Sequence, residues 1–372
     1  MKEANILIVG GGIGGLTSAI ALRRQGFNVD VIEKDPDWAV YGVGIIQQAN
    51  VVREMGKLDL IDEYLSVSFP FDMVKIFNPD GTLAVEIPTP KLAGDQYPSN
   101  IGVSRPALHK VLGDRTKKLG ANVFLGVTVD KFFDDGAAVL VDFSDGRQQS
   151  YDLVIGADGL YSKTRTQIFP EQPSPEFTGQ SVWRYNFPLD PNLDCLNAYE
   201  GRNGIGLVPL ADNLMYMYLV THEPDNPWMD VDGLAEKMRD RMEWVPPTLA
   251  HLREQITDDK GVVYKPLQTI FIRGPWHKGR ITLLGDAAHA TTPHLGQGAG
   301  MAIEDSIVLA EELVRAESVE EAFSAYKARR FERCKFIVEN SIAFGDYQMG
   351  KRDDISAAEL TRLMFEVTSE PI

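Results

Sequence analysis

Apolar residues near the start of the chain follow the pattern of a buried strand, a helix and a second strand. Ile6 to Val9 form a short, continuous apolar run, which is typical of a parallel strand covered on both faces. A group of glycines follows at once. Residues 14–25 then continue as a predicted helix that leads to a second strand over residues 29–32. This order predicts a strand–helix–strand unit whose helix begins directly after the glycines.

The glycines have the spacing G-x-G-x-x-G at Gly10, Gly12 and Gly15. Gly10 suits the tight turn, Gly12 leaves space for a pyrophosphate, and Gly15 lets the helix pack closely on the strand. The free N–H groups and the positive dipole end of the helix favour a phosphate at the same place. The pattern predicts a dinucleotide site, although a tight strand-to-helix turn without a ligand can carry the same glycines.

An acidic residue ends the second strand of this unit. Glu33 lies 23 residues after Gly10, where a carboxylate can accept hydrogen bonds from ribose hydroxyls. The same carboxylate would repel a 2′-phosphate, so FAD or NAD is favoured over NADP. The residues expected at the dinucleotide are Gly12, Gly14, Gly15, Glu33 and Lys34.

The rest of the chain alternates between short buried strands, helices and a long section of alternating strands rich in aromatic residues. We expect an α/β fold, in which a dinucleotide domain is assembled from separated segments and a β-rich domain is inserted into it. The expected ranges are 1–70, 100–175 and 274–330 for a three-layer Rossmann-like dinucleotide domain, 71–99 and 176–273 for a β-rich substrate domain, and 331–372 for a C-terminal helical segment.

Composition excludes several classes of protein. The net charge of −16 argues against a nucleic-acid surface, because phosphate binding needs a basic face. Two cysteines, Cys195 and Cys334, cannot form a disulfide framework, and a reducing cytosol is the simplest home for such a chain. No apolar stretch approaches the roughly 18 residues of a membrane span, and no signal peptide is evident. We expect a cytoplasmic monomer or homodimer without a membrane partner.

Two later motifs indicate which dinucleotide is bound. "DGLYSKTR" at residues 158–165 follows an apolar strand, and "GDAAHATTPHLGQGAGMAIED" at residues 285–305 follows another. Together with the N-terminal glycines, and in this order, they resemble the class A flavoprotein aromatic hydroxylases, the para-hydroxybenzoate hydroxylase family. The resemblance covers nearly the whole chain.

The resemblance implies an FAD-dependent monooxygenase. It implies tight, non-covalent FAD, with NADH or NADPH as a transient co-substrate, since the sequence has no second G-x-G-x-x-G. Reduced flavin would add O2 to form a C4a-hydroperoxide, which hydroxylates the substrate and decays to H2O2 if water reaches it. Short family members that act on small aromatic or N-heteroaromatic compounds are the most similar.

Several residues match the flavin contacts of the family. The carboxylate of Asp286 can bind a ribitol hydroxyl, and Arg105 matches an arginine near the pyrophosphate and ribitol. The backbone of residues 296–300 can lie along the flavin ring, and the helix beginning near Gly298 would stabilise the reduced anion. Asp158 and Arg165 inherit possible contacts to both FAD and NAD(P)H. The further expected FAD contacts are Gly44, Arg105, Asp158, Asp286, Pro293, Gly296, Gly298 and Ala299.

The substrate side is less defined by the resemblance. His294 lies in the loop against the flavin, and its imidazole is the first candidate for a general base, with Tyr216 as the second. His294 could equally serve only to bond a backbone carbonyl. Arg184 or Arg202 could neutralise a substrate carboxylate. The expected substrate residues are Gln47, Arg184, Tyr185, Tyr216 and His294, with Gln48 beside the first.

Some alternatives stay open on these residues. The aromatic residues Trp183, Tyr185, Phe187, Tyr216 and Tyr218 alternate along strands, and one face of each strand should line either a core or a substrate pocket. The acid and histidines of the 285–305 motif could be taken for a metal site, but no fourth ligand is suitably spaced, and we expect no metal.

Other flavoprotein classes also need to be considered. A flavin halogenase is disfavoured because none of the five tryptophans forms a W-x-W pair. An FAD-dependent reductase or dehydrogenase, or a flavin redox protein that hydroxylates nothing, is the alternative function.

Overall fold

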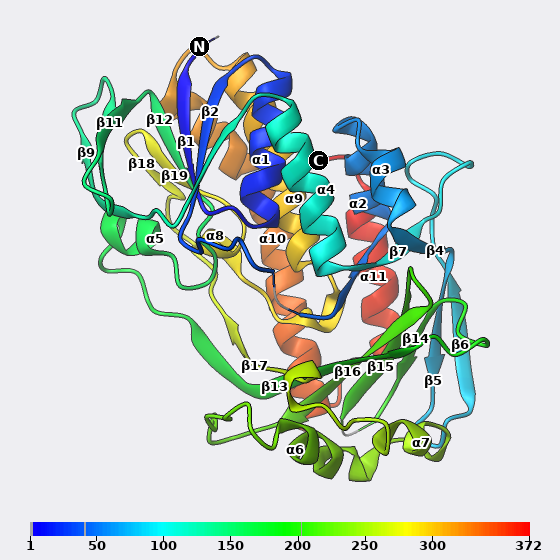
Figure 1. Ribbon diagram of the computed structural model, residues 1–372. Coiled ribbons are helices and arrows are strands. Elements are labelled where there is room, and N and C mark those ends of the chain that lie inside the picture. Colours follow the sequence, from blue (N-terminus) through cyan, green and yellow to red (C-terminus); the bar gives the residue numbers. More distant parts are fainter. Residues whose placement is uncertain (1–2, 41, 202) are drawn as a thin grey trace.

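The computed structural model describes residues 3–40, 42–201 and 203–372, and it has the expected α/β fold (Figure 1). A six-stranded sheet forms its centre, in the order β18-β19-β12-β1-β2-β8. All neighbouring pairs run parallel except β18 and β19. The bounds are β1 (Asn5–Val9), β2 (Asn28–Glu33), β8 (Asn122–Leu125), β12 (Leu153–Gly156), β18 (His277–Lys278) and β19 (Ile281–Leu283).

Helices and a small sheet cover the two faces of the central sheet. The helix α1 (Ile13–Arg24) packs against α4 (Arg105–Lys118) and α9 (Gly298–Arg315) on one side (Figure 1). An antiparallel sheet of β9 (Val129–Asp134), β10 (Val139–Phe143) and β11 (Gln148–Tyr151) lies on the other side. These are the three layers that the sequence predicts. The short helices of this part are α2 (Ala49–Lys57), α3 (Ile61–Ser66), α5 (Lys163–Ile168) and α8 (Asp286–His289).

A second large sheet has seven strands in the order β17-β13-β16-β15-β14-β5-β6. The bounds are β5 (Met73–Phe77), β6 (Leu83–Pro88), β13 (Glu176–Pro188), β14 (Leu196–Tyr199), β15 (Gly204–Leu210), β16 (Leu214–His222) and β17 (Val263–Thr269). The helices α6 (Leu234–Arg241) and α7 (Ala250–Arg253) cover its outer face (Figure 1). Trp183 and Met217 pack there against Leu234 and Met238 in a buried cluster of their own.

A three-stranded sheet of β3 (Gly44–Gln47), β7 (Asn100–Ser104) and β4 (Ser68–Phe71) joins the two large sheets. The joint is close, because a Cβ atom built on Gly102 would lie 1.9 Å from the carbonyl oxygen of Pro209 in β15. Only glycine allows the two backbones to approach this far.

Two C-terminal helices connect the parts of the molecule. The helix α10 (Val319–Gln348) is continuous over 30 residues, and α11 (Ala357–Ser369) follows it. The boundary expected after residue 330 therefore falls inside α10, and the division into domains stays a prediction. Among the described residues, no helix is both long enough and apolar enough to cross a membrane.

The joint at Gly102 gives a stability prediction. The substitution Gly102→Ala should lower the free energy of unfolding by about 1–3 kcal/mol, because the new methyl group overlaps the Pro209 carbonyl. Gly274→Ala is the matched control, because a Cβ there first meets a side-chain atom of Gln172 at 3.8 Å. Urea unfolding of both variants measures the difference. Equal stability of the two variants would contradict the prediction.

Candidate active site

A cavity of about 830 Å³ lies between the dinucleotide side of the molecule and the inner face of the seven-stranded sheet. This volume is at the upper end of the range for small-molecule sites. The cavity is lined by the glycine turn after β1, by β3, by the loop 284–299, by the inner face of the large sheet and by α10 and α11. The expected FAD loops and the expected substrate sheet therefore open into the same space.

The glycine turn has the geometry that a pyrophosphate needs. Gly10 has φ of 111°, and a Cβ on Gly15 would lie 1.9 Å from the Gly10 carbonyl oxygen, so these two glycines allow the turn and the close helix. Gly12 faces the cavity, and a Cβ on it would meet no protein atom within 4 Å. No side chain caps the start of α1, so its first N–H groups are available to a ligand.

Glu33 organises the turn itself. Its carboxylate accepts hydrogen bonds from the backbone N–H of Gly11 at 2.9 Å and of Asp35 at 3.0 Å. Neither Glu33 nor the exposed Lys34 lines the cavity, and Gly15 is a packing residue beneath it. Their contacts to a dinucleotide stay predictions. For Glu33, each carboxylate oxygen keeps one lone pair for a ribose hydroxyl.

Asp158 and Arg165 act within the protein. The carboxylate of Asp158 accepts bonds from the Ser162 hydroxyl and from the backbone N–H and hydroxyl of Thr164, at the start of α5. The buried guanidinium of Arg165 donates to the Ala287 carbonyl oxygen at 2.9 Å. Neither side chain lines the cavity. The motif therefore fixes one cavity loop against the other, and the adjoining Gly159, Leu160 and Tyr161 form the lining.

Asp286 projects into the cavity from a loop that a buried network holds. Gly285 has φ of 62°, and its N–H donates to Asp305 at 3.0 Å. The same Asp305 oxygen bonds Nε2 of His289 at 2.7 Å, and the other oxygen accepts from Nε of Arg330 at 2.7 Å. Burial alone would raise the pKa of Asp305, but His289 and Arg330 lower it to about 2. Asp305 is thus a fixed negative charge behind the cavity.

Asp286 lines the cavity, and its side chain is open to that space. Desolvation by the surrounding protein raises the pKa of its carboxyl, and the positive charges of His289 and Arg105 partly oppose this. Arg105 also lines the cavity, at the first turn of α4, where Ser104 caps the helix and Pro106 follows. A cation and an acid therefore lie on the same wall, as the polar part of a dinucleotide requires.

A loop without bulky side chains continues this wall. Gly296 has φ of 66°, and α9 begins at Gly298 without a capping side chain. Gln297 is turned away into the protein, where its amide exchanges hydrogen bonds with Asn50 and Gln48. Pro293, Gly296, Gly298 and Ala299 line the cavity, as does Gly44 on the facing strand. The described residues fit a flat ring laid along this backbone.

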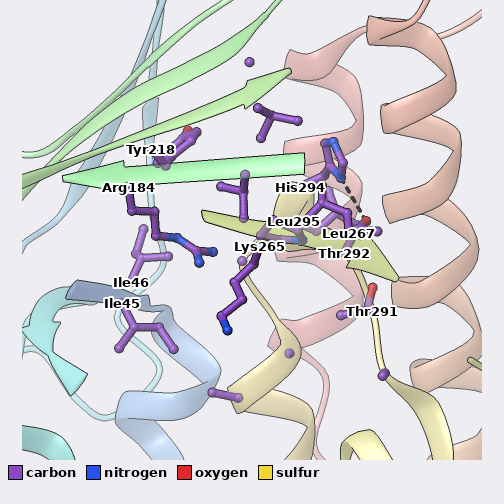
Figure 2. A pocket seen from close by; sticks show the side chains of 18 of the residues that line it. Ile45, Ile46, Arg184, Tyr218, Lys265, Leu267, Thr291, Thr292, His294 and Leu295 are labelled. Atoms are coloured by element: carbon purple, nitrogen blue, oxygen red, sulfur yellow. Dashed lines mark hydrogen bonds between the residues drawn. The ribbon is translucent and has the colours of Figure 1, made fainter. Parts of the chain in front are cut away.

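The inner face of the large sheet forms the opposite wall (Figure 2). Arg184, Tyr216 and Tyr218 line the cavity from β13 and β16. Tyr185 follows Arg184 in β13 and therefore points to the other face of the sheet. It packs on Phe187 in the outer core, with ring centroids 5.1 Å apart. The expectation that Tyr185 meets substrate is therefore wrong, because successive side chains of a strand point to opposite faces.

The structure also corrects the expectation for Gln47. Its side chain is fully buried and bonds the Ile46 carbonyl oxygen, and Gln48 lines the cavity in its place. Gln48 is held by the carbonyl oxygen of Leu295 at 3.2 Å. Arg202 lies outside the described residues.

Arg184 places an unneutralised cation in the cavity. Burial and the nearby charge of Arg105 lower its pKa to about 10, so it stays protonated at neutral pH. The groups that affect this pKa are Arg105 and Tyr216, and no carboxylate is among them. Burial raises the pKa of Tyr216, against the opposing effect of the two arginines. Tyr216 is therefore a neutral phenol beside two positive charges.

His294 lines the cavity, but both ring nitrogens already have partners. Nδ1 lies 2.8 Å from the hydroxyl of Thr292 (Figure 2), and Nε2 lies 3.1 Å from Oε1 of Gln348 in α10. Burial lowers the pKa of His294 to about 4. The imidazole is therefore neutral at physiological pH, and it is a weak base in this setting.

The potential metal ligands are arranged differently from the sequence expectation. Within the described ranges, the three that meet are His289, Asp305 and Cys334, and Asp286 and His294 are not part of the group. The guanidinium of Arg330 bonds Asp305 and lies 3.8 Å from the sulfur of Cys334. A positive side chain already holds the place of a cation here, so the group is a structural ion pair.

Comparison with known proteins agrees with this arrangement. The family model described as "FAD binding domain" matches residues 3–341. Aurachin C monooxygenase/isomerase of Stigmatella aurantiaca is 31% identical over 93% of this chain and 88% of its own. The 6-hydroxynicotinate 3-monooxygenase of Pseudomonas fluorescens is 31% identical over 89% of each chain. The crystal structure of Klebsiella pneumoniae HpxO complexed with FAD and uric acid superposes with a TM-score of 0.85, at 25% identity over 99% of this chain and 93% of that one.

This chain belongs to the class A FAD-dependent aromatic monooxygenases. As a member of this flavoprotein monooxygenase family it is an oxidoreductase with FAD as its cofactor. Which atoms hold the FAD stays a prediction, and the glycine turn, Arg105, Asp286 and the 293–299 loop are the parts of the chain that fit it.

The sequence missed several residues of this monooxygenase cavity. Lys265 and Leu267 come from β17 (Figure 2), Gln348 from α10, and Met364 and Phe365 from α11. Strand alternation could have grouped Lys265 with Leu267, because they are two residues apart. Nothing in the local sequence shows that α10 and α11 reach the cavity, since that contact depends on how the chain returns to the sheet.

The open space at Gly12 allows folding and FAD binding to be separated. Gly12→Ala should leave the stability of the FAD-free protein within about 0.5 kcal/mol and weaken FAD binding at least about tenfold, because its methyl group points only into the cavity. Gly15→Ala is the contrast, since its methyl group overlaps the Gly10 carbonyl and should reduce both stability and FAD binding. Flavin fluorescence titration and thermal unfolding give the two readouts. Normal FAD affinity in Gly12→Ala would place the pyrophosphate elsewhere.

The low pKa of His294 gives a pH prediction. The folded state keeps His294 neutral down to about pH 4, whereas an unfolded histidine binds a proton near pH 6.5. Stability should therefore fall as the pH falls from 6.5 toward 4, by roughly 1 kcal/mol between pH 7.5 and 5.5 from this group. His294→Asn should lose that part of the dependence in urea unfolding. The same pH dependence in both proteins would show that His294 is not held neutral.

Proposed function

We propose that this flavoprotein hydroxylates a small aromatic or N-heteroaromatic substrate, using NADH or NADPH and O2. The observation that carries the proposal is the unneutralised Arg184, set beside Tyr216 and Tyr218 across an otherwise largely apolar cavity from the loop that fits the flavin. The names of relatives support the substrate class, since they include 6-hydroxynicotinate 3-monooxygenase and 3-hydroxybenzoate 6-hydroxylase. A nicotinamide dinucleotide would bind transiently, because the chain has one dinucleotide fingerprint.

Arg184 would bind the anionic group of the substrate. A half-buried, desolvated cation without a carboxylate partner is costly, and an ionised hydroxyl or carboxylate of a substrate would relieve that cost. The same charge lowers the pKa of a substrate hydroxyl and so favours the electron-rich phenolate. Arg184 therefore promotes ionisation electrostatically, whichever group accepts the proton.

His294 and Tyr216 remain the candidates for proton transfer. A histidine with a pKa of about 4 is a weak proton acceptor, and its ring is already fixed by Thr292 and Gln348. We assign it the role of a positioning residue for the flavin loop. Tyr216 lies beside Arg184 and Arg105, and its hydroxyl would donate to, or exchange a proton with, the substrate anion.

The surroundings would protect the oxygen chemistry. Once reduced, bound FAD would supply oxygen activation, which the family resemblance assigns to a flavin C4a-hydroperoxide. The chain lines the cavity with the apolar side chains of Phe344, Met364 and Phe365, which would help to keep water from the reacting atoms.

The proposed function is tested by measuring whether NAD(P)H consumption and O2 uptake are coupled to the formation of hydroxylated product. The FAD-loaded protein should consume NADH or NADPH faster in the presence of a hydroxylated aromatic or N-heteroaromatic acid, and O2 uptake should yield hydroxylated product. A flavin reductase would consume the cofactor without inserting oxygen. A redox protein would show no substrate stimulation in any member of such a panel.

The role of Arg184 gives a specific prediction for that assay. Arg184→Met should raise KM for the anionic substrate about 10–100-fold, because a hydrogen bond to a charged group contributes roughly 1.5–3 kcal/mol. Arg184→Lys should retain part of the affinity, and FAD content should be unchanged in both variants. Steady-state kinetics with flavin absorbance measures all three quantities. An unchanged KM in Arg184→Met would remove Arg184 from the substrate site.

A further inference from the structure

One row of side chains crosses the cavity floor over five strands. The printed register pairs Arg184 with Tyr218, Tyr218 with Gly206, Gly206 with Ala198, and Ala198 with Ile76. Residues paired in this way point to the same face of a sheet. Four strand spacings separate the ends of the row, which corresponds to about 19 Å. A single aromatic ring with its substituent groups spans only part of this distance.

The row changes from charged to apolar along its length. Arg184 is its only charged member, and it stands at the β13 end. At the other end Ala198 and Ile76 line the cavity, with the neighbouring pair Leu196 and Val74 beside them. Most of the floor there offers a ligand apolar contact, and Glu200, two residues after Ala198, adds one carboxylate to the lining at its edge.

The two residues in the middle of the row, Gly206 and Ala198, have small side chains or none, so they project little into the cavity. The ring of Tyr218 lies across Gly206, where a Cβ atom would come within 2.4 Å of the ring and hydroxyl oxygen. Ala198 follows with a single methyl group. The cavity can therefore continue past the tyrosine toward β14 and β5.

The helix α11 adds apolar side chains to the cavity, and we call this part its roof. Met364 and Phe365 line the cavity, as do Val74 and Ile76 of the floor. Thr361 lines it one helical turn earlier. The walls at this end form an arm, defined by Val74, Ile76, Leu196, Ala198, Met364 and Phe365.

We propose that the substrate is an aromatic or heteroaromatic anion that carries an extended apolar substituent, with the anionic group at Arg184 and the substituent in the arm. This inference rests on the proposed function and narrows its substrate class. Burial of each methylene in the arm should tighten binding roughly fourfold. A monocyclic acid would leave the arm filled with water against apolar walls.

The test compares 3-hydroxybenzoate with 3-hydroxy-5-pentylbenzoate, both of which carry a carboxylate at neutral pH, using the FAD-loaded protein. Dissociation constants are measured from the change in flavin absorbance on binding, without turnover. We expect the pentyl compound to bind at least 100-fold more tightly. Equal affinity of the two compounds, or weaker binding of the pentyl compound, would overturn the inference.

Variants locate the effect in the arm. Ala198→Phe should abolish the advantage of the pentyl chain and leave the affinity for 3-hydroxybenzoate nearly unchanged. Thr361→Phe, from the roof, should do the same if Ala198→Phe does not fold. Leu363→Phe on the exposed face of α11 is the matched control and should keep the advantage. A pentyl advantage that survives both arm variants would also overturn the inference.

The two proposals fail in different ways. A pentyl chain is saturated, so a reductase that acts on carbon–carbon double bonds has nothing to reduce in it. Oxygen inserted into the ring of the product therefore reports hydroxylation alone. Tight pentyl binding without any hydroxylated product would contradict the proposed function and leave the apolar arm standing. Hydroxylation of both compounds with equal affinity would contradict the arm and leave the proposed function standing.

Discussion

The buried ion pair between Arg330 and Asp305 fixes the geometry on which the flavin side of the cavity depends. Nε of Arg330 and the Asp305 carboxylate are 2.7 Å apart, and neither side chain is exposed. Asp305 also holds the N–H of Gly285 and the ring of His289, so one carboxylate sets the loop from which Asp286 projects. Glu304 binds Arg330 as well, at 2.7 Å. Removing one partner of a buried pair of this kind typically costs about 3–5 kcal/mol, because the other charge stays buried.

On the opposite wall of the cavity, the inner face of the seven-stranded sheet, the charge of Arg184 has no carboxylate among the groups that affect its pKa. Arg330 is neutralised by two acids, whereas Arg184 has another arginine and a phenol as its charged or ionisable neighbours. A cation in that position is ready for an anionic ligand, and burial strengthens the attraction. The structural Arg330 and the proposed ligand-binding Arg184 thus differ in the charges that surround each of them.

Closure of the cavity depends on the end of the chain. Arg53 and Arg333 donate to the carbonyl oxygens of Ser369, the last residue of α11, and of Glu370, which follows it. These bonds hold α11 against α2 and α10, and α11 supplies the apolar roof of the arm. The C-terminal helices are therefore part of the active-site enclosure, and their sequence alone shows only that they are helices.

The sequence by itself determined the parts that depend on neighbours along the chain. The turn at Gly10, Gly12 and Gly15, the helix starts at Pro106 and Gly298, and the three-layer fold all follow from local spacing, because turns, caps and strand patterns are set within a few residues. The three motifs together also identify the family and its FAD. Most of the residues expected at the flavin, from Gly44 to Ala299, line the cavity, and their contacts to FAD stay predictions.

Only the tertiary structure decided which face of each strand meets the cavity. The alternation of side chains along a strand shows that Tyr185 and Tyr216 each point to one face of the sheet, but it does not show which face. In the structure Tyr185 packs in the core under α6, and Tyr216 lines the cavity. His294 acquires its low pKa from burial and bonds Gln348, 54 residues away, and the arm is formed by strands and a helix that are distant in sequence. Such contacts depend on how separated segments pack, and local spacing carries no information about that packing.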